Sequence, residues 1–400
     1  MILSDNIGSS NHHSHNFKMN KTIPEGGKQI MSNLKTNLWG RTFLNPVIPA
    51  AGPNVGSGLM LTRAAEGGAG GLLTKTISQE AAQVPHPNMV RIGKENLLNT
   101  ELWSELPPEA WFEREYDVAL AAARQHNLPI IGSVGYSAED LALLGPKLQA
   151  KGLEIIEFSI HYLDSQQLIH TAHTLRDVVS IPIIAKLSPH AGDLGEIAQL
   201  IDPYVDGFSC INSFGPTLTI DIETAGPSLG SKFGYGWLSG PAVKPLALRS
   251  VFEVAKVTDK PVIGVGGVSR GEDVIEYLMA GASLVGVCTA AILKGPDVYG
   301  KIAAEAAEWL DSHGYHSLDE VKGLYLKKMR EGQPVITAIE QVAWVNESAC
   351  KMCSQCERVC QFDAIQAPLK EIARVNADHC KACGLCVSVC PFGALELRAR

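Results

Sequence analysis

Several absences in this 400-residue sequence exclude whole classes of protein. The 34 Lys and Arg against 42 Asp and Glu give a formal net charge of −8, so we expect no basic face for nucleic acid or an anionic membrane. There is no run of about 18 apolar residues, which predicts that the chain has no membrane span. No secretory signal precedes the cysteines, which disfavours disulfides. With 46% hydrophobic residues, we expect a cytoplasmic enzyme with one large core and a small module.

The most informative feature that is present is a doubled cysteine pattern near the C-terminus. Two runs share the spacing C-x2-C-x2-C-x3-C, and they comprise Cys350, Cys353, Cys356, Cys360 and then Cys380, Cys383, Cys386, Cys390. This spacing is typical of two [4Fe–4S] clusters in which the fourth cysteine of each run ligates the other run's cluster. Zinc sites more often use C-x2-C pairs separated by a longer loop. The pattern therefore predicts two clusters and an electron-transfer enzyme or a subunit of one.

The body of the chain contains eight short apolar runs separated by amphipathic stretches. The runs cover residues 45–51, 70–77, 129–135, 153–159, 182–188, 206–212, 261–267 and 284–290. Runs of this length suit strands buried on both faces, and eight strands alternating with helices over roughly 250 residues are typical of a (β/α)8 TIM barrel. A doubly wound sheet is the alternative, and the absence of a G-x-G-x-x-G turn after the first strand weakens it.

Chemically active residues gather at the ends of these predicted strands, where a barrel has its active site. Two lysines close apolar runs, and buried lysines are rare without a partner, so an anionic or electron-rich ligand is indicated. Glycine pairs and polar residues close the last two runs, where barrels commonly bind phosphate. Together with the clusters, this indicates flavin mononucleotide (FMN), which can take two electrons and release them singly. The strand-end residues are Lys75, Thr76, Glu157, Ser159, Lys186, Asn212, Ser213, Gly266, Gly267, Cys288 and Thr289.

Several of these motifs occur in one order that resembles the dihydroorotate dehydrogenase family of FMN barrels. The resemblance runs from about residue 36 to 305 and rests on NPVIPAAGP (45–53), LLTKTIS (72–78), LLNTELWS (97–104), AKLSP (185–189), CINSFGP (210–216), WLSGPAVKPLALR (237–249), GVGGV (264–268) and GVCTA (286–290). With the double cluster, the chain is most similar to the pyrimidine-binding half of the dihydropyrimidine dehydrogenases. The resemblance implies FMN contacts at Ala50, Ala51, Gly52, Lys75, Thr76, Lys186, Ser239, Gly240, Gly266, Gly267, Cys288 and Thr289. It implies pyrimidine contacts at Asn99, Glu101, Asn212 and Ser213.

The chain departs from the family at the loop after the fourth strand. There the family has Asn-x-Ser-Cys-Pro, whose cysteine (serine in some members) moves a proton on the substrate, whereas this sequence reads Glu157-Phe158-Ser159-Ile160-His161. Reduction of a C=C bond needs a proton donor, and isoleucine cannot supply one. Three replacements are open: His161, which is best suited by its ordinary pKa, Ser159, and Glu157 if burial raises its pKa.

Glu157 also bears on the substrate. A carboxylate lining the pocket would repel the carboxylate of dihydroorotate in a low-dielectric site. We therefore expect reduction of a neutral pyrimidine base such as uracil or thymine to its 5,6-dihydro form. The alternatives are a non-pyrimidine ring substrate, dihydroorotate oxidation, and an electron-relay subunit with a degenerate active site.

The expected organisation has four parts. Residues 1–32 are a disordered extension, 33–310 the FMN-binding barrel, 311–342 a helical linker and 343–400 a two-cluster ferredoxin-like domain. Because no nicotinamide site is evident, an NAD(P)H-oxidising flavoprotein subunit or a soluble ferredoxin is the expected electron partner. The resemblance further implies a homodimer or a heterotetramer.

Overall fold

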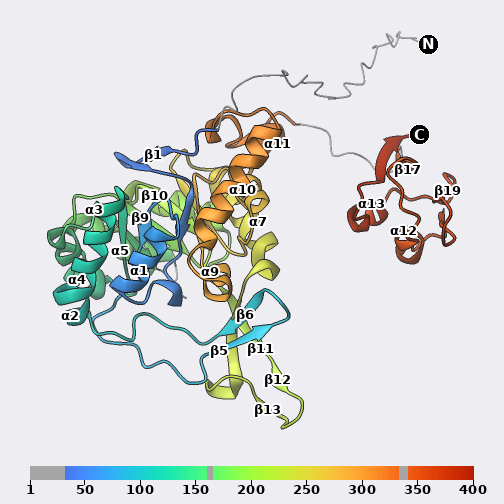
Figure 1. The fold of residues 1–400 in the computed structure, drawn as a ribbon. Coiled ribbons are helices and arrows are strands. Elements are labelled where there is room, and N and C mark those ends of the chain that lie inside the picture. Colours follow the sequence, from blue (N-terminus) through green and yellow to red (C-terminus); the bar gives the residue numbers. More distant parts are fainter. Residues whose placement is uncertain (1–31, 160–164, 333–340) are drawn as a thin grey trace, which may run out of the picture. The chain divides into compact units, whose positions relative to one another are not determined.

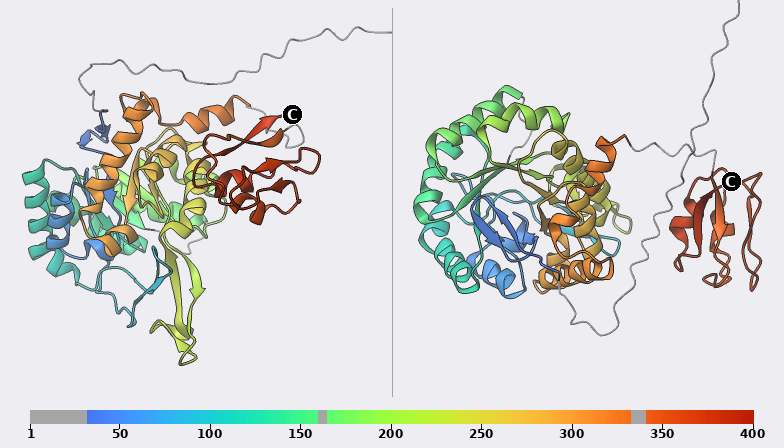
Figure 2. Two further views of the ribbon diagram at one scale, coloured as in Figure 1. Left: turned by 45° about the vertical axis from the view of Figure 1, so that its right-hand side comes forward. Right: turned by 90° about the horizontal axis from the view of Figure 1, so that it is seen from above.

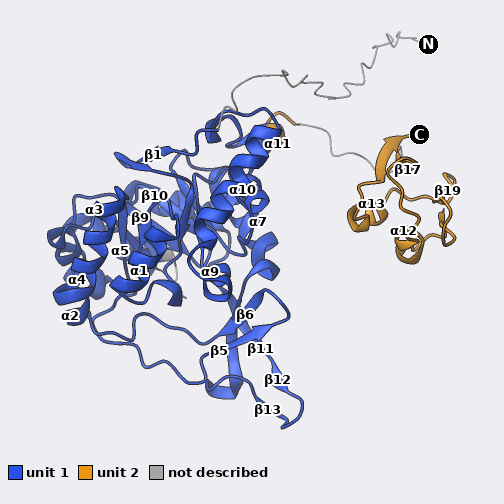
Figure 3. Cartoon of the chain, viewed as in Figure 1, with its two compact units in different colours: residues 1–327 blue, residues 328–400 orange. Residues whose placement is uncertain are grey.

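The computed structural model describes residues 32–159, 165–332 and 341–400. The chain divides between residues 327 and 328 into two units (Figure 3), and each is described by itself. The segment expected to be disordered lies outside the described residues, except for Ser32. The Ser32 amide donates to the Asp311 carboxylate at 2.9 Å and its hydroxyl to the Tyr315 carbonyl at 2.8 Å.

The first unit is built on eight parallel strands that lie side by side in chain order. Each strand pairs with its neighbours in parallel register, for example Glu157 opposite Ile184 and Lys186 opposite Ser209. The two end strands meet through Gly70, whose amide donates to the Val47 carbonyl at 2.8 Å. The (β/α)8 barrel that the sequence predicts is therefore confirmed. Its strands are β3 (Val47–Pro49), β4 (Leu72–Leu73), β7 (Ile130–Val134), β8 (Ile155–Ser159), β9 (Ile183–Leu187), β10 (Gly207–Cys210), β15 (Val262–Val265) and β16 (Leu284–Val287).

Helices surround this barrel as an outer ring (Figure 2). Their apolar faces pack against the outward-facing side chains of the strands, such as Ile156 and Phe158 of β8. The helices are α1 (Gly58–Glu66), α2 (Pro108–Ala110), α3 (Tyr116–His126), α4 (Ala138–Lys151), α5 (Ser165–Val178), α6 (Leu194–Ile201), α7 (Lys244–Ala255), α8 (Gly271–Met279), α9 (Thr289–Lys294) and α10 (Val298–Ser312).

The inside of the barrel changes from apolar to polar along the strands. Side chains alternate across a strand, so Ile155, Glu157 and Ser159 of β8 point to the barrel axis. Ile155 belongs to an inner apolar layer with one residue from most of the other strands. The hairpin of β1 (Thr36–Leu38) and β2 (Arg41–Phe43) packs Leu38 and Phe43 onto this layer. Apolar packing therefore closes one end of the barrel, and polar groups lie toward the other.

A small antiparallel sheet that the sequence did not predict projects from the barrel (Figure 1). It joins two segments far apart in the chain, one following β4 and one following β10. Its strands are β5 (Met89–Ile92), β6 (Asn96–Asn99), β11 (Phe214–Leu218) and β14 (Tyr235–Ser239), and a short hairpin of β12 (Ile220–Asp221) and β13 (Gly226–Pro227) extends from it. Because β6 and β14 end near the barrel mouth, this sheet positions Asn99 and Ser239 there.

The second unit consists of short elements that repeat. In chain order they are β17 (Gln341–Val345), α12 (Gln355–Val359), β18 (Ile365–Gln366), β19 (Arg374–Val375), α13 (Leu385–Val389) and β20 (Leu395–Ala399). The expected linker contains α11 (Leu324–Arg330), and its residues 333–340 lie outside the described part of the chain. None of the described helices is both long and apolar enough to cross a lipid bilayer.

Candidate active site

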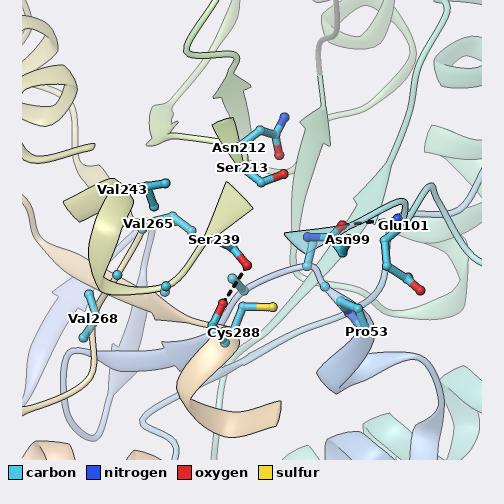
Figure 4. A pocket seen from close by; sticks show the side chains of 18 of the residues that line it. Pro53, Asn99, Glu101, Asn212, Ser213, Ser239, Val243, Val265, Val268 and Cys288 are labelled. Atoms are coloured by element: carbon cyan, nitrogen blue, oxygen red, sulfur yellow. Dashed lines mark hydrogen bonds between the residues drawn. The ribbon is translucent and has the colours of Figure 1, made fainter. Parts of the chain in front are cut away.

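One cavity at the C-terminal ends of the barrel strands collects the residues that the sequence singled out. All twelve residues expected to contact FMN line it: Ala50, Ala51, Gly52, Lys75, Thr76, Lys186, Ser239, Gly240, Gly266, Gly267, Cys288 and Thr289. The four residues expected to contact a pyrimidine line it too: Asn99, Glu101, Asn212 and Ser213 (Figure 4). Segments up to 240 residues apart in the sequence therefore form one site.

Lys75 and Glu101 form a buried ion pair in the cavity wall. Lys75 ends the apolar run of β4, and its Nζ lies 2.9 Å from the Glu101 carboxylate. The side chains are 5% and 10% exposed. Asn88 donates to the other Glu101 oxygen at 2.7 Å, so the carboxylate is held from two sides. Because breaking a buried pair leaves an uncompensated charge, each partner keeps the other in place.

Lys186 has a different partner, Glu157 on the neighbouring strand. The Lys186 Nζ lies 3.9 Å from Glu157 Oε1, and the side chains are 7% and 1% exposed. That Glu157 oxygen is buried with no hydrogen-bond partner among the described residues. The sequence predicts that Glu157 lines the cavity, and this is wrong: of the pair, only Lys186 does. The alternation of β8 instead places Glu157 one layer deeper, so its charge reaches the cavity through Lys186.

Of the three proposed proton donors, Ser159 and Glu157 can be placed, and of these two only Ser159 lines the cavity. Ser159 is 3% exposed, and its hydroxyl accepts a hydrogen bond from the Asn212 side-chain amide at 3.3 Å. Ile160 and His161 lie outside the described residues. The role of His161 therefore stays a prediction from the sequence.

Two of the residues expected to contact a pyrimidine, Asn99 and Glu101, are held by hydrogen bonds at the small antiparallel sheet. The Asn99 amide donates to the Trp237 carbonyl at 3.0 Å, and the Asn99 side-chain oxygen accepts from the Glu101 backbone amide at 3.2 Å. In Figure 4, Asn99 and Glu101 lie on one side of the cavity, and Asn212 and Ser213 extend toward it from another element. This set offers both donors and acceptors, as recognition of a ring with N–H and C=O groups requires.

The turn after β15 forms a close backbone wall. Gly266 and Gly267 have φ angles of 140° and 74°, which favour glycine. A Cβ on Gly267 would lie 2.8 Å from the Lys244 Cβ and 2.9 Å from the Gly240 carbonyl oxygen. Side chains are therefore excluded there, and the backbone itself can approach a ligand. These groups fit FMN. The exposed backbone of the turn and the hydroxyls of Ser239 and Thr289, which lie 2.8 Å apart, suit a phosphate. Lys75 and Lys186 at the strand ends suit an electron-rich ring.

Cys288 is a neutral thiol in this cavity. Burial raises its pKa to about 11, although Lys75 and Lys186 act in the opposite direction. A Cβ on Gly52 would lie 2.4 Å from the Cys288 sulfur, so Gly52 is required for the thiol to fit. A thiol with this pKa is almost entirely protonated at pH 7 and is a poor nucleophile.

Tyr136 and the Glu95–Lys294 pair also line the cavity, and none of these three residues is predicted from the sequence to do so. Tyr136 follows β7, and burial raises its pKa well above the ordinary value. Glu95 lies in the turn between β5 and β6 and pairs with Lys294 of α9 at 2.9 Å. The position of Tyr136 directly after an apolar run was the available signal for it. No local pattern pairs Glu95 with a residue 199 positions away.

The eight clustered cysteines surround two small cavities in the second unit. One is lined by Cys350, Cys353, Cys356 and Cys390, and the other by Cys360, Cys380, Cys383 and Cys386. The fourth cysteine of each run thus lies with the first three of the other run, as the spacing predicts for clusters. Backbone amides of Ala364 and Ala394 donate to the sulfurs of Cys360 and Cys390, both at 3.4 Å. In the described parts of the chain, no three His, Cys, Asp or Glu side chains are grouped to hold a single metal ion.

Comparison with known proteins gives two domain matches and a set of relatives. The model of the dihydroorotate dehydrogenase family matches residues 33–310, and the model of a 4Fe-4S dicluster domain matches residues 343–397. The chain is 33% identical over 311 residues to the catalytic subunit of dihydroorotate dehydrogenase B (NAD(+)) from Pyrococcus furiosus, which covers 74% of this chain and 99% of that protein. The subunit of the same name from Thermoplasma volcanium is 33% identical over 311 residues, covering 74% and 100%. That from Methanocaldococcus jannaschii is 32% identical over 312 residues, covering 73% and 97%.

Proposed function

The chain belongs to the dihydroorotate dehydrogenase family and carries an iron–sulfur domain, and from this premise we propose that it exchanges electrons between a pyrimidine-like ring and its clusters. The reaction would interconvert a CH–CH and a C=C bond. The observation that carries the proposal is that all sixteen residues expected to contact FMN or a pyrimidine line the same cavity.

FMN is the cofactor that the family implies, and it would supply two-electron chemistry on the substrate and one-electron chemistry toward the clusters. Lys75 and Lys186 would hold its electron-rich ring. The backbone at Gly240, Gly266 and Gly267 would hold its phosphate, with the Ser239 and Thr289 hydroxyls. Lys75, Lys186, Gly240 and Thr289 are buried, and their burial would keep water away from the reacting ring.

The remaining cavity residues would bind and orient the substrate. The amides of Asn99 and Asn212 and the hydroxyl of Ser213 can match the donors and acceptors of a pyrimidine ring. Ser159 is oriented by the Asn212 side-chain amide at 3.3 Å, but an amide cannot accept a proton, so the hydroxyl would need a further group to activate it. His161 follows two residues later and is the more suitable acid by type. We propose that one of the two handles the substrate proton, because the family's cysteine position is occupied by Ile160.

Two candidate pyrimidine substrates, dihydroorotate and a neutral base, are each favoured by a different observation. The names of the relatives favour dihydroorotate over the base reduction expected from the sequence. A neutral base such as uracil is the second candidate. It is favoured by the ion pairs of Lys75 and Lys186, which leave neither lysine without a carboxylate partner.

Electrons would pass between the flavin and an outside partner through the two clusters. The relatives are named as catalytic subunits, and we propose an NAD(P)H-oxidising flavoprotein subunit or a soluble ferredoxin as the partner. A homodimer or heterotetramer in the cytoplasm completes the proposal.

Anaerobic photoreduction of the FMN- and cluster-loaded protein tests this proposal. The reduced protein is mixed with uracil, thymine and orotate, and flavin reoxidation is followed by absorbance. We expect at least one ring to reoxidise the flavin. If none does, the ring substrate lies outside the pyrimidines.

The proton donor is then assigned with two variants. We expect His161→Ala or Ser159→Ala to slow reoxidation by 10²-fold or more, as loss of a general acid does, while the other variant stays within a few-fold of the parent. Equal, small effects from both would contradict either role.

A further inference from the structure

Each cation that lines the cavity, among the described residues, is paired with a glutamate. The cations are Lys75, Lys186 and Lys294, and their partners lie at 2.9 Å (Glu101), 3.9 Å (Glu157) and 2.9 Å (Glu95). Five of these six charged side chains line the cavity, Glu157 lies behind Lys186, and the six charges sum to zero. A ligand carboxylate entering it would meet no uncompensated lysine.

One of the three pairs is far more exposed than the other two, because the side chains of Lys75 and Glu101 are only 5% and 10% exposed. The side chains of Lys294 and Glu95 are 43% and 48% exposed, so solvent and salt screen their charges. Lys186 and Glu157 are 7% and 1% exposed, where charges interact at much lower effective dielectric. Of these two pairs, only Lys186–Glu157 can control the field inside the cavity.

The Lys186–Glu157 pair is also incomplete. At 3.9 Å it is an ion pair without a hydrogen bond, and Glu157 Oε1 is a buried oxygen with no hydrogen-bond partner among the described residues. On the other side of Lys186, strand β10 places Ser209 opposite it, and the Ser209 hydroxyl is also buried, with no hydrogen-bond partner in the part of the chain that the structure describes. A buried polar group left unpaired is costly. The charge of Glu157 is therefore retained at a cost, which points to a role beyond packing.

We propose that Glu157 is a positioning residue that acts through Lys186 and makes the cavity select an uncharged ring over a ring carboxylate. The ligand class rests on the proposed pyrimidine function. The charge control of Lys186 does not, because it follows from burial and distance alone. Without the Glu157 charge, Lys186 is a buried cation in need of an anion, and a ring carboxylate is an anion of suitable size.

The test compares Glu157→Gln with the parent as FMN-loaded, oxidised protein. Dissociation constants for uracil and orotate are measured from the perturbation of the flavin absorbance. We expect uracil to bind the parent more tightly than orotate, and Glu157→Gln to shift the ratio of the two constants at least tenfold toward orotate. Glu95→Gln is the matched control, because it removes the same charge from an exposed pair, and we expect it to shift the ratio less than threefold.

Two further variants separate charge from structure. Glu157→Asp keeps the charge and should restore the parent ratio. If Glu157→Gln does not fold, the double variant Glu157→Gln/Lys186→Met removes both buried charges and should keep the preference for uracil. A double variant that favours orotate overturns the proposal, and so does an unchanged ratio in Glu157→Gln.

A second readout separates this proposal from the proposed function. The two-electron potential of the bound flavin needs no substrate, and a more positive surrounding stabilises the reduced, more anionic form. We expect Glu157→Gln to raise this potential by about 30 mV, the equivalent of a tenfold change for two electrons, and Glu95→Gln to leave it in place. If neither ring binds and the potential still rises, the pyrimidine substrate is wrong and the charge control stands. An unchanged potential overturns the charge control.

Discussion

At the scale of single residues, Asp140 ties two loops of the cavity wall together. One carboxylate oxygen accepts from the Ser78 hydroxyl and the Gln79 amide after β4. The other accepts from the Tyr136 and Ser137 amides after β7. The same residue closes a capping box with Ser137 at the start of α4. Thr76 and Tyr136, which line the cavity, therefore depend on one side chain for their relative position.

Replacing Asp140 with Asn should destabilise the barrel by about 2 kcal/mol at pH 7, because several charge-assisted hydrogen bonds are lost. Burial opposes the effect, but the hydrogen bonds from Ser137, Tyr136, Gln79 and Ser78 hold the pKa of Asp140 below its ordinary value. A lowered folded-state pKa gives stability that is present above the unfolded pKa of about 3.9 and is lost as the pH falls through the folded value. The gap between the two proteins should therefore shrink below about pH 4. Urea unfolding followed by circular dichroism from pH 7 to pH 3.5 measures this.

Asp193→Asn is the matched control for that experiment. Asp193 caps α6 by accepting from the Gly195 and Glu196 amides and joins no second loop. We expect it to cost about 0.5 kcal/mol, because Asn caps a helix about as well as Asp and only the favourable charge at the helix N-terminus is lost. An Asp140→Asn loss no larger than this would show that the link between the loops contributes nothing.

The sequence predicts residues at the cavity better than it predicts their partners. Lys75 and Lys186 stand out because they end apolar strands, which is a local signal. The carboxylates that pair with them follow from the fold. Glu101 lies just after strand β6 of a separate sheet, and Glu157 faces Lys186 below the cavity lining. The position of Glu157 relative to Lys186 follows from strand alternation only once the register between β8 and β9 is known.

At the scale of elements, the eight barrel strands were predictable and the antiparallel sheet was not. Barrel strands are continuous apolar runs because both of their faces are buried. Strands β5 and β11 are short and only partly buried, so they lack this signature. Their pairing also depends on segments brought together by the barrel, which no local pattern contains.

The glycine turn after β15 gives a prediction at this scale. Gly267→Ala should lower bound FMN by more than half and destabilise the barrel by roughly 1–3 kcal/mol. The reasons are the strain of an alanine at a φ of 74° and the crowding of its Cβ against Lys244 and the Gly240 carbonyl. FMN content after gel filtration and the thermal midpoint measure the two effects.

Gly152→Ala controls for strain alone. Gly152 ends α4 at a φ of 99°, and a Cβ there would meet no atom within 4 Å. This variant should lose stability and keep its FMN. Equal FMN loss in both variants would mean that the turn after β15 has no special role in binding.

At the scale of the whole molecule, the relatives account for the barrel and the dicluster match accounts for the C-terminal unit. The relatives align with 74% of this chain and almost all of their own length, so about a quarter of this chain extends beyond them. The dicluster match at residues 343–397 lies in the C-terminal unit. The cysteine spacing alone predicted that unit, because cluster ligation constrains sequence as strongly as any fold element does.

Double cysteine variants decide both the number of clusters and their ligands. Cys360→Ser/Cys383→Ser removes two ligands from one cavity, and Cys353→Ser/Cys360→Ser removes two from one sequence run. With ligands shared between the runs, the first variant should keep about half of the iron of the parent, because the other cavity retains all four cysteines. The second variant damages both cavities and should lose nearly all of it. Ligation within each run predicts the reverse, with half of the iron in the second variant and almost none in the first. Colorimetric iron content and the visible absorbance of anaerobically reconstituted protein distinguish shared ligation from ligation within each run. More iron in the second variant than in the first would show that the grouping of cysteines around the two cavities does not describe the clusters.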